Sequence, residues 1–158
     1  MTKEIERKFL VKIMPNIDDL ESFLYERYFL FRNENVEIRI QKKGEKYEFE
    51  RKEKENNLSA NKQKFEISKE EFDKLKENSK EAIVRESYLL SKNPEISLKI
   101  YHGRFEGLKR IEVEFEDEKS AKNFLLPNWF GNEITNTPLG KDSKLLDLTK
   151  EEFENLIK

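Results

Sequence analysis

In the stretch EIERKFLV, residues 4–11, the charged residues Glu4, Glu6 and Lys8 alternate with Ile5, Arg7 and Phe9. Such alternation is typical of a β-strand, because successive side chains point to opposite faces of the sheet. One face of this strand carries Glu4, Glu6 and Lys8. The two carboxylates would lie about 7 Å apart by strand geometry and repel each other unless a cation lies between them. The question is whether this charged face meets solvent or encloses a ligand.

The same alternation recurs along the chain, between polar or glycine-containing turns. We expect strands over residues 4–12, 25–31, 36–41, 46–52, 63–67, 83–90, 95–101 and 108–116. Capping boxes predict two helices: Ser68 with Glu71 begins one that extends to about residue 78, and Thr149 with Glu152 begins one over 150–157. A third helix is expected near 118–125.

Short strands at this spacing are typical of an antiparallel barrel or sandwich rather than a βαβ sheet. No linker or long-period repeat divides the sequence, so we expect one domain over residues 1–158. Its class would be α+β, mainly antiparallel β, with the helices on one side of the sheet.

The composition excludes several function classes. The 31 basic and 33 acidic residues are interspersed, and the net charge is only −2, which argues against a surface for duplex nucleic acid or anionic membrane. The chain has no cysteine, so a thiolate metal site and a cysteine nucleophile are excluded. The start MTKEIERK lacks a hydrophobic signal region and no apolar run approaches membrane-spanning length, so we expect a cytoplasmic protein.

One face of the predicted sheet is charged with both signs. It carries Glu4, Glu6, Lys8, Arg39, Glu48, Glu50, Lys52, Lys64, Glu66, Arg85, Lys99, Glu112 and Glu114. In an open sheet this face is simply solvated, which is the ordinary condition and the one that alternation alone favours. In a closed barrel it would line a cavity. Lysine and arginine would then neutralise phosphate oxygens, and clustered carboxylates would hold Mg²⁺ or Mn²⁺.

Several segments of the sequence resemble those of a known family. EIERKFLV resembles the ExExK signature of the CYTH domain, the triphosphate tunnel metalloenzymes. VEIRI (36–40) is similar to the arginine-bearing hairpin of the family, and the strand ending at Lys52 to its lysine-bearing strand. RIEVEFE (110–116) is similar to its late Glu-x-Glu strand, and NWFGNEIT (128–135) to a segment of the bacterial members. The resemblance covers nearly the whole chain in order.

The resemblance implies an eight-stranded closed β-barrel, a tunnel with a charged interior and flanking helices. It implies a hydrolase that uses Mg²⁺ or Mn²⁺ and directs water onto the terminal phosphoryl group of inorganic tripolyphosphate or a small organic triphosphate. Carried over by position, the metal ligands would be Glu4, Glu6, Glu112 and Glu114. The phosphate-binding residues would be Lys8, Arg39, Lys52 and Arg85. Glu66 would be a further acidic residue of the wall.

Three positions depart from the family pattern. Gln41 and Ser87 stand where basic residues are usual, and Lys99 stands where an acidic metal ligand is usual. Lys99 could instead take over part of the phosphate-binding charge. These departures leave open a weakened activity or a non-catalytic polyphosphate- or nucleotide-binding module. A class IV-like adenylate cyclase is a further alternative, because such cyclases share the fold of the family. Because several relatives form dimers, a homodimer also stays open.

We expect ordinary structural roles for the remaining conspicuous residues. His102 lacks a second histidine or a paired nucleophile, so we expect it at a turn or on the surface. The aromatic side chains of YERYFLF (25–31) are expected in the core, and Trp129 and Phe130 are expected to anchor the C-terminal segment on the barrel. The five glycines are scattered, which excludes a glycine-rich phosphate loop, so any phosphate would be held by side chains.

Overall fold

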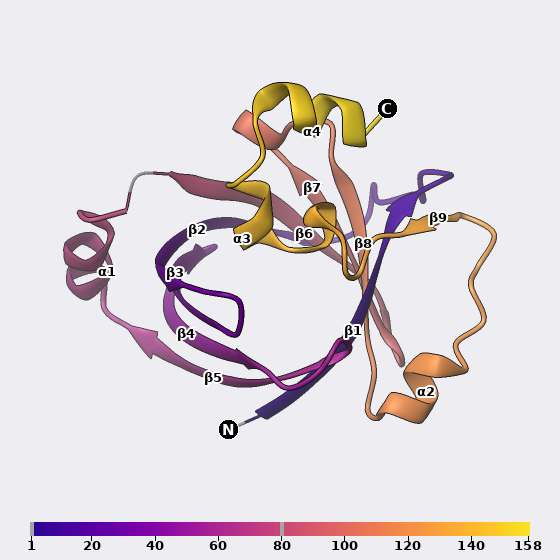
Figure 1. Cartoon of the computed structure of the whole chain (residues 1–158), viewed down its shortest axis with the longest axis horizontal. Helices are drawn as coiled ribbons and strands as arrows, with labels where there is room; N and C mark the ends of the chain where they lie inside the picture. Colours follow the sequence, from indigo (N-terminus) through magenta and orange to yellow (C-terminus); the bar gives the residue numbers. More distant parts are fainter. Residues whose placement is uncertain (1, 80) are drawn as a thin grey trace.

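The computed structural model of the chain describes residues 2–79 and 81–158, and Figure 1 shows a barrel of strands with short helices around it. The strands are β1 (Thr2–Val11), β2 (Ser22–Arg32), β3 (Val36–Lys43), β4 (Lys46–Lys54), β5 (Ser59–Ile67), β6 (Ala82–Lys92), β7 (Glu95–Tyr101), β8 (Lys109–Glu114) and β9 (Phe130–Glu133). The helices are α1 (Lys69–Lys76), α2 (Glu118–Lys122), α3 (Asp142–Leu145) and α4 (Lys150–Leu156), with 3₁₀ turns η1 (Gly103–Phe105) and η2 (Pro138–Gly140).

The sheet closes on itself through β1. Its strand order is β5-β4-β3-β2-β6-β7-β8-β1, and β1 pairs back with β5, so eight antiparallel strands among the described residues form a closed barrel. The first half of β1 pairs with β5, from Thr2 opposite Lys62 to Ile5 opposite Ser59. The other edge of β1 pairs with β8. The prediction of a closed eight-stranded barrel with a charged interior and flanking helices is confirmed.

The apolar core lies outside the barrel wall, between the strands and the helices. On β1, Ile5 and Phe9 belong to a core cluster that includes Phe130 and, on α2, Ala121. A second cluster packs Leu145 and Phe153 of the C-terminal segment against the wall. A third places Phe72 of α1 against β2, β3 and β4. Because the apolar faces of the strands turn outward to the helices, their charged faces turn into the barrel.

Several elements differ from the expected boundaries. β5 begins at Ser59 rather than at residue 63, and α2 ends at Lys122 rather than near residue 125. β9 and α3 are short elements that no pattern predicted. β9 forms because β5 covers only the first half of one edge of β1, and the free backbone groups beyond it need partners. The backbone N–H of Ile134 accordingly donates to the carbonyl oxygen of Lys8.

The aromatic run of β2 is only partly in the core. Tyr28 packs against Phe72 of α1, with ring centroids 5.8 Å apart, as expected. Tyr25 instead lines the cavity inside the barrel, and Phe31 is half exposed. Trp129 and Phe130 do anchor the C-terminal segment: the Phe130 ring packs on Phe9 with centroids 4.9 Å apart. His102 is at a strand end and half-exposed, hydrogen-bonded to Glu86.

Candidate functional site

A cavity of about 560 Å³ lies inside the barrel, and all eight barrel strands contribute side chains to its lining. Of the residues expected at the site, the cavity brings together Glu4, Glu6, Lys8, Arg39, Lys52, Arg85, Lys99, Glu112 and Glu114. Glu66 is exposed on β5 and is not part of the lining. The charged face of β1 is therefore enclosed rather than solvated.

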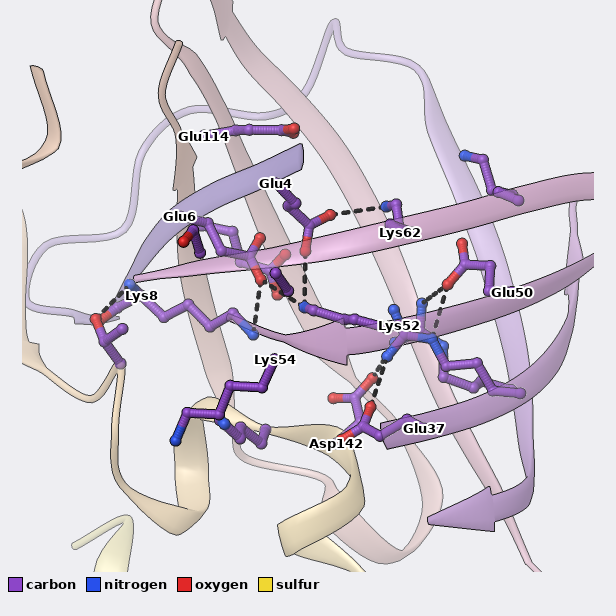
Figure 2. A pocket seen from close by; sticks show the side chains of 18 of the residues that line it. Glu4, Glu6, Lys8, Glu37, Glu50, Lys52, Lys54, Lys62, Glu114 and Asp142 are labelled. Carbon is purple, nitrogen blue, oxygen red and sulfur yellow. Dashed lines mark hydrogen bonds and ion pairs between the residues drawn. The ribbon is translucent and has the colours of Figure 1, made fainter. Parts of the chain in front are cut away.

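Lysines relieve the repulsion between the two carboxylates of β1. Lys52 Nζ lies 2.7 Å from Glu4 Oε1 and 3.4 Å from Glu6 Oε1, and Figure 2 shows it between the two side chains. Lys62 Nζ is 2.7 Å from the second oxygen of Glu4, and Lys8 Nζ is 3.1 Å from Glu6. Burial alone would raise both pKa values, but these ammonium groups hold the pKa of Glu4 well below its usual range and lower the pKa of Glu6 to about 2.

Glu114 lies at the same end of the cavity and lacks a cationic partner among the described residues. It pairs in register with Glu6 on β1 and with Glu95 on β7. Partial burial, a hydrogen bond with Glu95 and the charges of Glu4 and Glu6 raise the pKa of Glu114 to about 7. Negative charge is therefore in excess at this end of the barrel.

The carboxylates at this end have the donor chemistry that hard divalent cations prefer. They are not gathered as a metal site: in the part of the chain that the structure describes, no three acidic or histidine side chains converge closely enough to hold an ion. The donor set fits Mg²⁺ or Mn²⁺ chemically, and the uncompensated charge at Glu114 is where a cation would be favourable.

Glu112 has a different environment from Glu114, although both face the cavity. Its Oε2 accepts hydrogen bonds from Arg110, with Nη2 at 2.6 Å and Nε at 2.9 Å, and lies 3.4 Å from Arg85 Nη1. Burial would raise the pKa of Glu112, but the nearby positive charges, Arg110 foremost, hold it well below the usual range. Glu112 therefore already has two cationic partners.

Three arginines converge on Asp142, the first residue of α3. Arg27 Nη1 is 2.8 Å from Asp142 Oδ2, and Arg85 Nη1 and Arg110 Nη2 each lie 3.2 Å from a carboxylate oxygen. The hydroxyl of Tyr101 donates to Asp142 Oδ1 at 2.6 Å. The carboxylate is fully enclosed, and although burial opposes ionisation, the arginines keep its pKa well below the usual range. Asp142 thus fixes the positions of three guanidinium groups in the cavity wall.

Sequence reasoning missed Arg27, Arg110 and Asp142 as site residues. A signal existed for two of them: Arg110 shares a strand face with Glu112, and Arg27 shares a face with Tyr25, because each pair is two residues apart. Arg27 lies within the aromatic run YERYFLF, which indicated a core strand rather than a charged site. For Asp142 the sequence has no periodic signal, since α3 is a single short turn whose place depends on the rest of the fold.

Gln41 has a structural role in this wall. Its side-chain oxygen accepts from Arg27 Nε at 2.9 Å and Nη2 at 2.7 Å, while its amide nitrogen donates to Glu48 and Glu50. Glu50 in turn accepts from Arg39 Nε at 2.7 Å. Gln41 therefore links the two arginines of β2 and β3 through neutral and charged hydrogen bonds, without adding positive charge to the cavity.

No family model matches the chain. It is 30% identical over 145 residues to an inorganic triphosphatase from Nitrosomonas europaea, an alignment that covers 90% of this chain and 95% of that protein. A crystal structure of an inorganic triphosphatase matches it with a TM-score of 0.66 at 27% identity, over 92% of this chain and 95% of that one. A protein from Hippeastrum described with a dominant triphosphatase activity shares the fold, with a TM-score of 0.52 at 14% identity over 77% and 83% of the two chains.

None of the helices in the described ranges has the length and apolar character needed to cross a membrane.

Proposed function

Since the chain belongs to the CYTH, or triphosphate tunnel, family, we propose that it is a metal-dependent hydrolase of triphosphate-containing substrates. The substrate would be inorganic tripolyphosphate or a small organic triphosphate. The observation that carries this proposal is the enclosed cavity, whose wall bears basic and acidic side chains from all eight barrel strands. A polyphosphate with its cation supplies both signs of charge and can pair with both the basic and the acidic groups, whereas a neutral or apolar ligand can pair with neither.

The residues proposed to bind phosphate are Lys8, Arg39, Lys52 and Arg85. All four line the cavity, and each is at present paired with a carboxylate, as Arg39 is with Glu50. Phosphate oxygens would add to or replace these partners, and a guanidinium can bind them with two parallel hydrogen bonds. Because the site is enclosed, such contacts are stronger than they would be at a surface in water.

The carboxylates proposed to hold Mg²⁺ or Mn²⁺ are Glu4, Glu6, Glu112 and Glu114. A bound divalent cation would neutralise charge on the phosphoryl group that is transferred to water. Glu114 supports this assignment, since its charge has no cationic partner among the described residues. Glu112 is held by Arg110 and would have to share its carboxylate between that arginine and a cation.

The mechanism proposed for the protein's own residues is positioning and charge neutralisation. Lysine and arginine side chains would hold the phosphate chain straight along the barrel, so that a water molecule and the leaving oxygen lie in line. The arginines held by Asp142 need no rearrangement when the substrate binds, because hydrogen bonds already fix them. The negative charge that develops on the phosphoryl oxygens would be stabilised by groups placed in advance.

The test is release of phosphate by the purified protein. Tripolyphosphate, thiamine triphosphate and ATP are each incubated with Mg²⁺ or Mn²⁺, and orthophosphate, pyrophosphate and cyclic AMP are measured. We expect orthophosphate from tripolyphosphate or an organic triphosphate, and none after chelation of the metal. Cyclic AMP with pyrophosphate from ATP would show a cyclase instead. Binding without any product would show a non-catalytic module, and either result overturns the proposal.

A further inference from the structure

Lys99 on β7 is a buried ammonium group that has no carboxylate partner among the described residues. Its exposed fraction is 7%, and Nζ donates to Ser87 Oγ at 2.5 Å. Within residues 2–79 and 81–158, no carboxylate oxygen lies within 4.0 Å of this ammonium group. Burying a charge without an opposite charge is costly, so such groups are rare unless they have a ligand to bind.

The groups that face Lys99 leave positive charge in excess. They are Tyr25 and Arg27 on β2, Arg85 on β6, and Arg110 and Glu112 on β8. Glu112 is already paired with Arg110 and Arg85, and Asp142 is shared among three arginines. The centroid of the Tyr25 ring lies 5.3 Å from Lys99 Nζ and 5.3 Å from Arg85 Cζ, so both cations are close to one aromatic ring. A cation–π contact is a weak substitute for an anion.

Arg85, also in this part of the cavity wall, has incomplete hydrogen bonding as a second, independent observation. Its Nη1 is shared by Tyr101, Glu112 and Asp142. Its Nε is buried and lacks a hydrogen-bond partner. In the described part of the chain, every other buried side-chain nitrogen or oxygen has such a partner. An unpaired buried donor costs free energy, and buried donors in native proteins are nearly always satisfied by protein, water or ligand. The side chains of Arg85 and Lys99 both line the cavity.

Lys99 lies at a distance from the acidic end of the barrel. On β7, Glu95 pairs with Glu114, whereas Lys99, four residues further along the strand, pairs with Arg110. Strand geometry separates these two levels by about 13 Å. The cavity is therefore charged unevenly along its length, with excess negative charge near Glu114 and excess positive charge near Lys99.

We propose that Arg85 and Lys99, both close to the ring of Tyr25 in the cavity wall, form an anion subsite that binds the end of the polyphosphate chain remote from Glu4, Glu6 and Glu114. The proposal rests on the proposed function and deepens it, because it assigns the chain a direction in the barrel. In this subsite Lys99 Nζ and the guanidinium group of Arg85 donate to phosphoryl oxygens. The positive charge of the subsite at this level thus comes from Lys99 on β7. Its register partner on β6, Ser87, is uncharged.

The test is binding of tripolyphosphate in the presence of a chelator, measured by calorimetry, with thermal unfolding measured in parallel. Lys99→Met keeps the length of the side chain and removes its charge. We expect binding about tenfold weaker or more, the effect of losing one charge-assisted hydrogen bond. We expect a Tm equal to or above that of the wild type, because an unpaired buried charge is removed. Lys109→Met, at an exposed residue of β8 outside the cavity lining, is the matched control and should leave binding unchanged.

A double variant tests whether the charge itself is what matters. Because Ser87 and Lys99 are directly opposed in register, Ser87→Lys with Lys99→Ser moves the ammonium group to the neighbouring strand. We expect this variant to bind tripolyphosphate within a few-fold of the wild type. A purely structural role for Lys99 predicts the opposite pattern, a lowered Tm for Lys99→Met with unchanged binding.

The subsite is overturned if Lys99→Met binds as tightly as the wild type, or if the wild type binds no tripolyphosphate in chelator. These results are separable from failure of the proposed function. A protein that binds through Lys99 but releases no phosphate with Mg²⁺ or Mn²⁺ would retain the subsite and lose the hydrolase.

Discussion

The ammonium group of Lys52, on β4, lies 2.7 Å from a carboxylate oxygen of Glu4, on β1. The two strands are not neighbours in the sheet, since β5 lies between them, so the contact exists only because the barrel is closed. Without a ligand, most charges of the interior are compensated by pairs of this kind, those of Glu114 and Lys99 being exceptions among the described residues. A polyphosphate and a divalent cation would compete for the two halves of the pair, the anion for Lys52 and the cation for Glu4.

Glu4→Gln tests the acidic half of this pair. The substitution keeps the size of the side chain and removes the charge that Lys52 and Lys62 share, so we expect turnover of tripolyphosphate to fall at least tenfold. The far-UV circular dichroism should be unchanged. The control is Glu55→Gln, at an exposed residue that pairs with Lys3 on the surface. Equal loss in both variants would contradict a specific role of Glu4.

Arg39→Ala tests the basic side of the cavity. Arg39 is buried and its guanidinium group binds Glu50 and Glu37. Its loss therefore removes a prearranged hydrogen-bond donor to phosphate. We expect kcat/KM to fall at least tenfold, which corresponds to about 1.5–3 kcal/mol for a hydrogen bond to a charged group. Arg51→Ala, on the adjacent strand, removes an arginine whose partner Glu53 is half exposed, and should retain activity. If Arg39→Ala were fully active, the proposed phosphate-binding role of Arg39 would be wrong.

Asp142→Asn tests the anchor of the three arginines. The pKa of Asp142 is lowered in the folded protein, because the arginines outweigh the effect of burial. Its contribution to stability is therefore complete above the unfolded pKa of about 4 and is lost as the pH falls below it. We expect Asp142→Asn to lose about 3–5 kcal/mol of unfolding free energy at pH 7, the cost of breaking a buried ion pair. The difference from the wild type should narrow as the pH is lowered from about 4.

Asp147→Asn is the control for that experiment. Asp147 pairs with Arg32 at 2.9 Å, but its side chain is 55% exposed, and exposed pairs contribute less than about 1 kcal/mol. Urea unfolding of the two variants between pH 2 and pH 8 compares them directly. A loss for Asp142→Asn as small as that for Asp147→Asn would show that the arginines do not depend on Asp142.

Lys99 predicts a second pH dependence, on the alkaline side and of the same sign as that of Asp142, with stability rising as the pH rises. Burial and the charges of Arg85, Arg27 and Arg110 outweigh the carboxylate of Glu112 and lower the pKa of Lys99 to about 8. An unfolded lysine keeps its proton to about pH 10.4. Between these values the unfolded state binds more protons, so stability rises with pH relative to Lys99→Met. Urea unfolding of both proteins from pH 7 to pH 10 measures this, and parallel curves would contradict it.

Period-2 alternation correctly predicted which β1 residues share a face, because strand geometry is local. It could not predict whether the sheet closes, since an open and a closed antiparallel sheet place the same residues on one face. The resemblance of EIERKFLV and RIEVEFE to a known family decided that question. The Lys52–Glu4 pair joins strands that are not adjacent, and the place of Asp142 depends on how the C-terminal segment packs, so neither could be found from local patterns.

The most direct measurement of the central claim is a crystal structure with a non-hydrolysable tripolyphosphate analogue and Mn²⁺, whose anomalous scattering locates the ion. We predict phosphate density inside the barrel, in contact with Arg39, Lys52 and Arg85, and an Mn²⁺ peak beside the carboxylates of the Glu114 end. Analogue bound on the outer surface, with the Lys52–Glu4 pair intact and the cavity filled by water alone, would contradict the claim that the barrel encloses its substrate.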